Sequence, residues 1–185
     1  MNSGVLMKPV TVGDVEELRD VALRAYKDHY LHLWYDSGEW YMEKSFSISN
    51  LSIELNNSNA KFYIIYLDNV AAGFLKLNID APFPSHPNLN LLELERIYLT
   101  KAASGKGVGS AAVDFVCNIA AEYNKQAVWL KVMDSSEGPI TFYKKHGFEI
   151  CGTFHLDFEQ MKEEVRGMYV MKKSIGSYLT PVLDC

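Results

Sequence analysis

Apolar residues recur along the chain with two different periods, and these periods predict alternating strands and helices. Runs rich in β-branched and aromatic residues predict strands at 8–12, 61–67, 70–78, 91–99, 127–133, 148–154 and 168–171. Helical spacing and helix-start residues predict helices at 14–26, from about 47 to 57, at 108–123 and at 139–146. This order is typical of an α/β (α+β) fold in which a mixed sheet carries helices on both faces.

The composition narrows the class of protein. The 185 residues are 48% hydrophobic and carry a net charge of −5, which predicts one folded domain at 1–176 followed by a C-terminal tail at 177–185. No apolar run approaches the roughly 20 residues that span a bilayer. A pI near 5.5 is unlike that of proteins that bind phosphate backbones. We therefore expect neither a membrane nor a nucleic acid as partner.

Three cysteines, Cys117, Cys151 and Cys185, are an odd and widely spaced set, and none belongs to a CxxC pair. Such a set predicts no disulfide framework and no zinc site. The histidines also lack metal-ligand spacing, and no secretory signal is evident near the N-terminus. We therefore expect a cytoplasmic protein without a metal.

A glycine-rich loop lies between the predicted strand at 91–99 and the helix at 108–123. It reads Ser-Gly-Lys-Gly-Val-Gly-Ser over residues 104–110. Glycines let a backbone approach a ligand closely, and the free N–H groups of a helix start attract anions, so this loop predicts a phosphate or pyrophosphate site. It is neither a Walker A loop nor a dinucleotide fingerprint. The alternative is a flexible turn with helix caps.

A second signal lies in the predicted helix at 139–146, where Phe142 and Tyr143 are followed by Gly147 and Phe148. The Tyr143 phenol is a weak acid and a hydrogen-bond donor, so it could protonate a departing thiolate. In the alternative interpretation both aromatic residues belong to the core and Gly147 ends the helix.

Taken together, residues 93–99, 104–110 and 142–148 resemble the GNAT superfamily of Gcn5-related, acyl-CoA-dependent N-acetyltransferases. The loop pattern of that family matches at Gly107 and Gly109, with Ser104 where Arg or Gln is usual. A second departure is Ser136, where the family often has Asn. Segments 54–63 and 73–78 resemble, less specifically, the bacterial branch related to spermidine/spermine acetyltransferases.

The resemblance implies a GNAT fold, with helices on both faces of a mostly antiparallel twisted sheet, in which the strand that ends at Leu99 and the strand that ends near Met133 splay apart. Acetyl-CoA would then be the co-substrate, with its pantetheine paired to backbone groups of Ile97 and Leu99, and an N–H near Ile97 or Tyr98 would polarise the thioester carbonyl. The implied cofactor-binding residues are Ile97, Tyr98, Leu99, Ser104, Gly105, Lys106, Gly107, Val108, Gly109, Ser110, Ser136 and Tyr143.

The attacking amine must be neutral, so the site needs a base or a surrounding of low dielectric constant. Strand alternation predicts that Glu93 and Glu95 share one face with Ile97 and Leu99, which makes both carboxylates candidate bases. Alternatively they are solvated strand charges, paired with Arg96 or Lys76. Tyr143 aligns with the general acid of the family.

The aromatic stretch at 26–42 predicts one wall of an acceptor pocket, with helical packing as the alternative. The candidate substrate-binding residues are Tyr30, Trp34 and Glu95, and His29 and His32 lie in the same stretch. The acidic run at 157–164 predicts a solvated loop or, alternatively, a surface that attracts a cationic amine.

The sequence therefore predicts direct transfer of an acetyl group from acetyl-CoA to a primary amine of a small molecule in a ternary complex. A polyamine or an aminoacyl compound is the expected acceptor. The alternatives are an acyl-CoA-binding regulatory module without turnover and a protein that binds another nucleotide through the glycine loop. A homodimer is left open, because Tyr169 and Tyr178 could pack against a partner.

Overall fold

A computed structural model describes residues 4–83 and 86–176; the predicted tail with Tyr178 and Cys185 lies outside these residues. The helices are α1 (Val15–His29), α2 (Glu39–Phe46), α3 (Ile48–Leu55), α4 (Val108–Glu122) and α5 (Glu137–Lys145). The strands are β1 (Val5–Pro9), β2 (Ala60–Leu67), β3 (Val70–Asn78), β4 (Leu91–Leu99), β5 (Ala127–Met133), β6 (Glu149–His155) and β7 (Gly167–Ser174).

The strands form one seven-stranded sheet in the order β1-β2-β3-β4-β5-β7-β6. Only β4 and β5 pair in parallel; every other neighbouring pair is antiparallel. The parallel pair is connected through α4, the crossover that the sequence predicts between strands 91–99 and 127–133. The mixed, mostly antiparallel sheet expected from the sequence is therefore confirmed.

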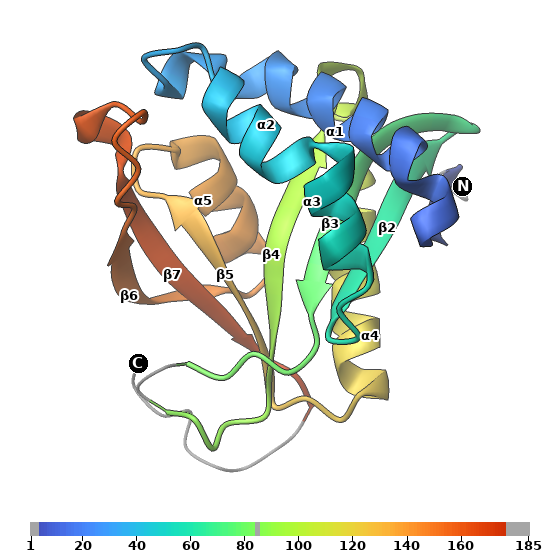
Figure 1. Cartoon of the computed structure of the whole chain (residues 1–185). Helices are drawn as coiled ribbons and strands as arrows, with labels where there is room; N and C mark the ends of the chain where they lie inside the picture. Colours follow the sequence, from blue (N-terminus) through green and yellow to red (C-terminus); the bar gives the residue numbers. More distant parts are fainter. Residues whose placement is uncertain (1–3, 84–85, 177–185) are drawn as a thin grey trace.

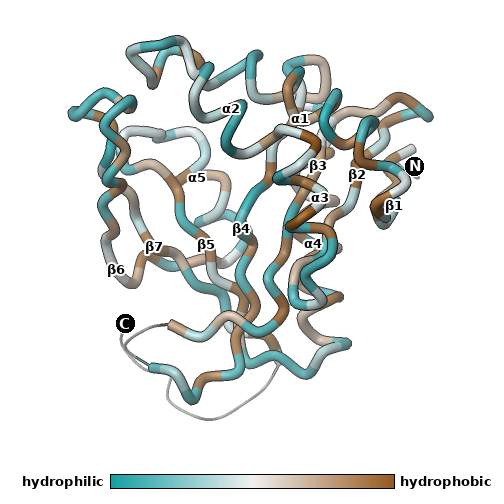
Figure 2. Tube along the Cα trace, in the orientation of Figure 1, coloured by the Kyte–Doolittle hydropathy of each residue, from teal (hydrophilic) through white to brown (hydrophobic). Residues whose placement is uncertain are grey.

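Helices cover both faces of the sheet, and each face has its own core. In Figure 1, α1, α2 and α3 cross one face, and α4 lies behind the sheet. Apolar residues recur along the central strands, as the brown segments in Figure 2 show, because those strands are covered on both sides. Successive residues of β3 illustrate this, since Phe74 packs with α1, α2 and α3 while Leu75 packs with α4.

The two central strands separate halfway along their length. Residues Leu91–Leu94 of β4 pair with Ala127–Leu130 of β5, and the pairing stops there. Figure 1 shows β4 and β5 meeting at the bottom of the view and diverging upward. The divergence expected from the sequence is present, and it leaves one side of each strand without a neighbour in the upper half of the sheet.

A β-bulge in β4 changes which side chains share a face. Lys76 of β3 lies opposite Arg96, but the next residue of β3, Leu77, lies opposite Leu94, so Glu95 is the extra residue. Ile97 and Leu99 therefore pack on the α4 side, whereas Glu95 contacts residues on the α3 side. The prediction that the two glutamates share a face with Ile97 and Leu99 is wrong, because simple alternation does not continue through a bulge.

Helix α2 is absent from the sequence prediction. It begins after Gly38, whose φ of +82° suits glycine, and the carboxylate of Asp36 accepts hydrogen bonds from the N–H groups of Gly38 and Trp40. The run Asp36-Ser-Gly-Glu39 has the spacing of a capping box and was the available signal. The first strand also differs: it spans Val5–Pro9 rather than 8–12.

At the start of α1, Asp14 accepts hydrogen bonds from the N–H and the hydroxyl of Thr11 and pairs with Lys8 at 3.0 Å. These bonds to Thr11 and Lys8 lower the pKa of Asp14 to about 2. Because the folded-state pKa lies below the usual 3.8, the stabilisation is complete above about pH 4 and is lost as the pH falls toward 2. Asp14→Asn is therefore expected to lower the Tm by a few degrees at pH 7, and the difference from wild type should shrink between pH 4 and pH 2.

Candidate active site

A cavity of about 490 Å³ occupies the space where β4 and β5 diverge. It lies between α1 and α2 on one side and the start of α5 on the other, and residues of the β6–β7 connection close one wall. Eight of the residues predicted from the sequence to form the site line it: Tyr30, Trp34, Glu93, Glu95, Ile97, Tyr98, Ser136 and Tyr143.

The open edge of β4 presents backbone groups of two residues to this gap. Thr100 donates its N–H to the carbonyl of Ala72 at 2.8 Å, and the carbonyl of Tyr98 lies against Gly73, so Tyr98 and Thr100 both face β3. Alternate residues of a strand direct their N–H and C=O groups to opposite sides. Ile97 and Leu99 therefore direct theirs toward β5, into the gap. Of the two oxyanion donors left open by the sequence, this geometry favours the N–H of Ile97.

The glycine-rich loop follows the end of β4 and leads into α4. Gly105 and Gly107 have φ values of +72° and +77°, which side chains other than glycine adopt only with strain. A Cβ at either position would meet nothing within 4 Å, so the loop is open to a ligand. The first N–H groups of α4, which begins at Val108, have no partner within the helix.

The loop is held against the helix that carries Tyr143. A Cβ added at Gly109 would lie 3.2 Å from the ring of Phe142, so a larger residue would push that ring away by a few tenths of an ångström. His146 joins the same helices, because its Nδ1 donates to the carbonyl of Phe142 at 2.9 Å and its Nε2 lies 3.1 Å from the Ser110 hydroxyl. His146 therefore links α4 to α5.

Tyr143 lines the cavity from α5. Its side chain is buried, and its ring packs on Phe142 and Phe148 with centroids 5.3 and 5.6 Å away. No hydrogen bond of its hydroxyl to another described residue is present, so the hydroxyl is available to a ligand. Burial, together with the nearby Tyr30, raises the pKa of Tyr143 above its ordinary value. The phenol is therefore protonated at neutral pH and can act as a donor.

Glu95 lies in a partly buried cluster of charges. Its carboxylate lies 2.7 Å from the Lys76 ammonium and 3.1 Å from the Arg96 guanidinium, and Arg96 forms two hydrogen bonds to Glu54 of α3 at 2.8 and 3.0 Å. Burial alone would raise the pKa of Glu95, but Arg96 and Lys76 outweigh it and hold that pKa below its ordinary value. Pairing with Lys76 and Arg96, the structural alternative given by the sequence, is thus present.

Glu93 lies beside this cluster and shares a partner with Glu95. The side-chain amide of Asn78 donates to both carboxylates, at 2.8 Å to Glu93 and 2.7 Å to Glu95. Lys131 of β5 donates to the other Glu93 oxygen at 3.0 Å and so bridges the gap between the two strands. The two carboxylates are therefore neighbours on one wall of the cavity, each already paired with a cation.

An aromatic cluster forms the wall opposite α5. Trp34 donates its indole N–H to the Tyr26 hydroxyl at 2.6 Å and stacks on Tyr41 at 5.0 Å, and Tyr30 packs on Tyr98 at 5.1 Å. The predicted aromatic wall is thus present in Tyr26, Tyr30 and Trp34, to which Tyr41 adds a fourth ring. The same stretch supplies four residues that do not line the cavity, namely His29, His32, Tyr35 and Trp40.

Residues 156–166 fold over the site rather than forming a solvated loop throughout. Met161 is buried beside Trp34, Lys162 donates its N–H to the carbonyl of Leu33 at 2.9 Å, and Phe158 lines the cavity. The acidic side chain of Asp157 is exposed. In the sequence, this wall of the cavity was indicated only by Phe158 and Met161, two apolar residues spaced three apart within the acidic run at 157–164.

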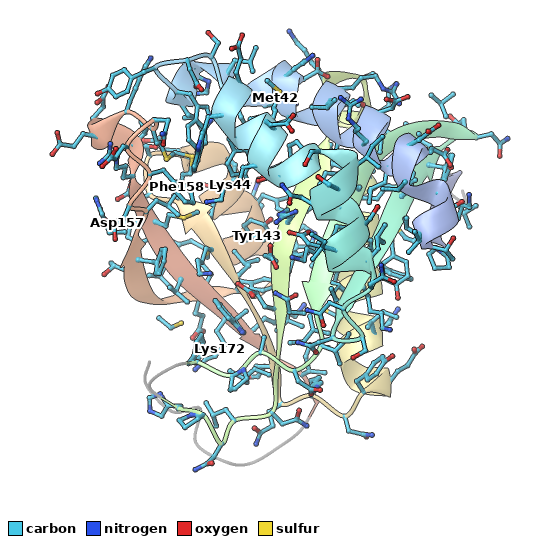
Figure 3. All side chains as sticks on the ribbon, viewed as in Figure 1. Met42, Lys44, Tyr143, Asp157, Phe158 and Lys172 are labelled. Carbon is cyan, nitrogen blue, oxygen red and sulfur yellow. The ribbon has the colours of Figure 1, made fainter. Side chains whose placement is uncertain are left out.

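Sequence reasoning also missed two cations of the cavity, Lys44 of α2 and Lys131 of β5. Figure 3 shows Lys44 and Phe158 lying together above Tyr143. Within 4–83 and 86–176, no three His, Cys, Asp or Glu side chains gather as a metal site. In the same ranges, no helix combines the length and the apolar character needed to cross a bilayer.

Comparisons with known proteins converge on one family. The model of the acetyltransferase (GNAT) family matches residues 15–148. An uncharacterized N-acetyltransferase from the pepI 3′ region of Lactobacillus delbrueckii subsp. lactis is 32% identical over 107 residues. That match covers 58% of this chain and 62% of the relative, so it spans less than two thirds of the relative's length.

Solved structures of acetyltransferases share the fold. PaiA N-acetyltransferase from Thermoplasma acidophilum, solved in complex with coenzyme A, matches with a TM-score of 0.71 and 22% identity over 92% of this chain and 98% of its own. Ribosomal-protein-alanine N-acetyltransferase from Brucella melitensis matches with a TM-score of 0.68 and 18% identity over 92% and 99% of the two chains. At these identities the likeness concerns the fold.

Proposed function

This chain belongs to the acetyltransferase (GNAT) family, and we propose that it transfers an acetyl group from acetyl-CoA directly to a primary amine of a small molecule. The observation that carries this proposal is the cavity between the diverging strands, which has the free backbone edge of β4 on one side and Tyr143 on the other. A relative with the same fold binds coenzyme A.

The residues around the gap fit this co-substrate, which supplies an acyl group activated as a thioester. Backbone groups of Ile97 and Leu99 pair with the amides of the pantetheine arm as a neighbouring strand would. The N–H groups of the loop from Ser104 to Ser110 hold the diphosphate at the positive end of α4. Ser104 offers a shorter side chain than the usual Arg or Gln, so the backbone carries most of this contact.

Two groups act on the reacting atoms. The N–H of Ile97 polarises the carbonyl and holds the negative charge that develops on its oxygen as the amine nitrogen bonds to the carbonyl carbon. Tyr143 donates its proton to the sulfur as the carbon–sulfur bond breaks. The phenolate left on Tyr143 then takes up a proton from water, so that the donor is restored for the next turnover.

The proton released by the amine leaves toward the carboxylate wall. Glu95 is held ionised by Lys76 and Arg96, so it is a weak base that attracts the ammonium form rather than deprotonating it outright. Glu93 is bound to only one cation, Lys131, and to Asn78. We therefore assign proton uptake to Glu93, directly or through water, and electrostatic support to Glu95.

The test is the release of CoA thiol. Purified protein is incubated with acetyl-CoA and each member of a panel of primary amines, and free thiol and acetylated amine are measured together. Equal amounts of both products support transfer. Binding of acetyl-CoA in a thermal shift assay, with no thiol released from any amine, would instead support the regulatory module. Stabilisation by ATP but not by CoA would support the nucleotide-binding alternative.

A glycine substitution tests the diphosphate site. Gly107→Ala places a Cβ at a φ of +77°, which costs about 1 kcal/mol and turns the N–H groups of the loop. The Kd for CoA is expected to rise about five- to tenfold, measured by calorimetry. Gly138→Ala, which adds a Cβ in open space on α5, is the control and should leave the Kd unchanged.

For the acceptor we propose only its chemical class, and for the location of the protein only the cell compartment. A polyamine or an aminoacyl compound was expected because Glu93 and Glu95 are acidic, yet both are paired with cations of the chain itself. A primary amine is therefore the acceptor proposed here. A cytoplasmic location is proposed on the odd and widely spaced set of three cysteines in the sequence.

A further inference from the structure

The cavity has more positive than negative side chains. Three cations line it, Lys44, Arg96 and Lys131, against two carboxylates, Glu93 and Glu95. Arg96 is paired with Glu54 and Glu95, and Lys131 is paired with Glu93. The remaining positive charge of the lining is therefore that of Lys44.

Lys44 is held by aromatic rings rather than by an acid. Its ammonium lies 4.6 Å from the ring centre of Trp40 and 4.7 Å from that of Phe158. Among the ion pairs of the described residues, none includes Lys44. Asp157, the acid next to Phe158, has an exposed side chain that lies 4.0 Å from His155. The rings fix the position of the ammonium without neutralising its charge.

The surroundings of Lys44 define the rest of a subsite. Trp34, Tyr41 and Phe158 supply aromatic surface beside it, and Met161 closes the wall. Figure 3 shows Lys44 and Phe158 next to each other, above Tyr143 in the view. An acceptor can therefore place its amine near Tyr143 and Glu93 while its other end meets an apolar wall and one cation.

We propose that the acceptor is a small amine with an anionic group, such as a carboxylate, on an aromatic or apolar body, and that Lys44 binds that anion. This inference rests on the proposed acetyl transfer. A polyamine fits poorly, because its second ammonium would approach Lys44 without a free carboxylate to receive it. A charge-assisted contact to a positioned ammonium favours the carboxylate form by about tenfold or more over a neutral analogue.

The experiment measures CoA release with matched pairs of acceptors. The pairs are para-(aminomethyl)benzoate with its carboxamide, and 6-aminohexanoate with 6-aminohexanamide, so that the amine and the anion lie at opposite ends of each acid; spermidine is added as a polyamine. The ratio of kcat/KM for acid over amide is determined for wild type and for Lys44→Met. Comparing the two ratios cancels the intrinsic reactivity of each amine. Lys44→Arg retains the charge, and Lys61→Met removes a charge from a separate cavity.

Wild type is expected to prefer the acids about tenfold. That preference should fall close to unity in Lys44→Met, persist in Lys44→Arg and be unchanged in Lys61→Met. Equal rates for acid and amide in wild type, or faster turnover of spermidine, would overturn the inference while leaving acetyl transfer intact. A lower Tm of Lys44→Met with the acid preference retained would reduce Lys44 to a packing role and also overturn it. No CoA release from any amine would overturn the proposed function and this inference with it.

Discussion

Tyr143→Phe is expected to lower kcat about a hundredfold, because the departing sulfur then leaves without a proton donor. The affinity for CoA should change less than twofold, since the ring that packs on Phe142 and Phe148 is retained. The hydroxyl has no hydrogen bond to another described residue, so the Tm should also stay close to that of wild type. Steady-state kinetics, calorimetry with CoA and a thermal melt give the three quantities.

The matched control is Tyr123→Phe, which removes a phenol hydroxyl from the separate cavity near Asp80 and Lys125. It should leave kcat unchanged. The pKa of Tyr143 is raised by burial, so the phenol stays protonated and its loss of a proton cannot limit turnover until the pH exceeds 10. A variant that turns over at the wild-type rate would show that the sulfur takes its proton from another group.

The strands that carry the site were the most predictable part of the fold. The predicted bounds of the strands at 70–78, 91–99 and 127–133 are those of β3, β4 and β5, because helices cover these central strands on both faces and most of their residues are apolar. For the edge strand β1, by contrast, the predicted bounds of 8–12 were shifted along the chain from the observed Val5–Pro9. Its residues are half-buried or exposed, so its pattern constrains its bounds less.

The β-bulge at Glu95 in β4 could in principle have been predicted from the sequence. Leu92 and Leu94 pack on the α4 side, and the next residues to do so are Ile97 and Leu99, so the interval between Leu94 and Ile97 is three rather than two. A strict period of two cannot place all four on one face. That interval distinguishes a bulged strand from a regular one, and it places Arg96 on the same face as Glu95, in the charged cluster with Lys76.

The walls of the cavity away from the sheet were much less predictable. Lys44 and Phe158 are separated by more than a hundred residues, and they meet only because α2 and the β6–β7 connection fold over the same gap. Local periodicity carries no information about such pairs. The motif residues Tyr143 and Gly107 were found because their chemistry is encoded by neighbours in the sequence, whereas the acceptor wall is assembled from distant segments.

Arg96→Met is expected to lower the free energy of unfolding by about 3 kcal/mol, because it leaves two carboxylates, those of Glu54 and Glu95, in a partly buried site with Lys76 as their only shared cation. The side chain of Arg96 is only 11% exposed, whereas those of Glu54 and Glu95 are 26% and 25% exposed, so water offsets part of the loss and the cost lies at the low end for a broken buried ion pair. For a chain of this length the Tm should fall by about 6–12 °C. Arg24→Met, which removes an exposed arginine with one backbone contact to Ala71, is the control for loss of an arginine.

A second substitution separates the ion pair from simple packing. Glu54→Gln removes one of the two carboxylates that Arg96 neutralises, so in that background Arg96→Met should cost less than in wild type. Equal costs in the two backgrounds would mean that Arg96 stabilises the fold through its aliphatic stem alone. A smaller cost would show that Glu54 of α3 and Arg96 of β4 are coupled electrostatically, and Arg96 also contacts Glu95 in the wall of the cavity.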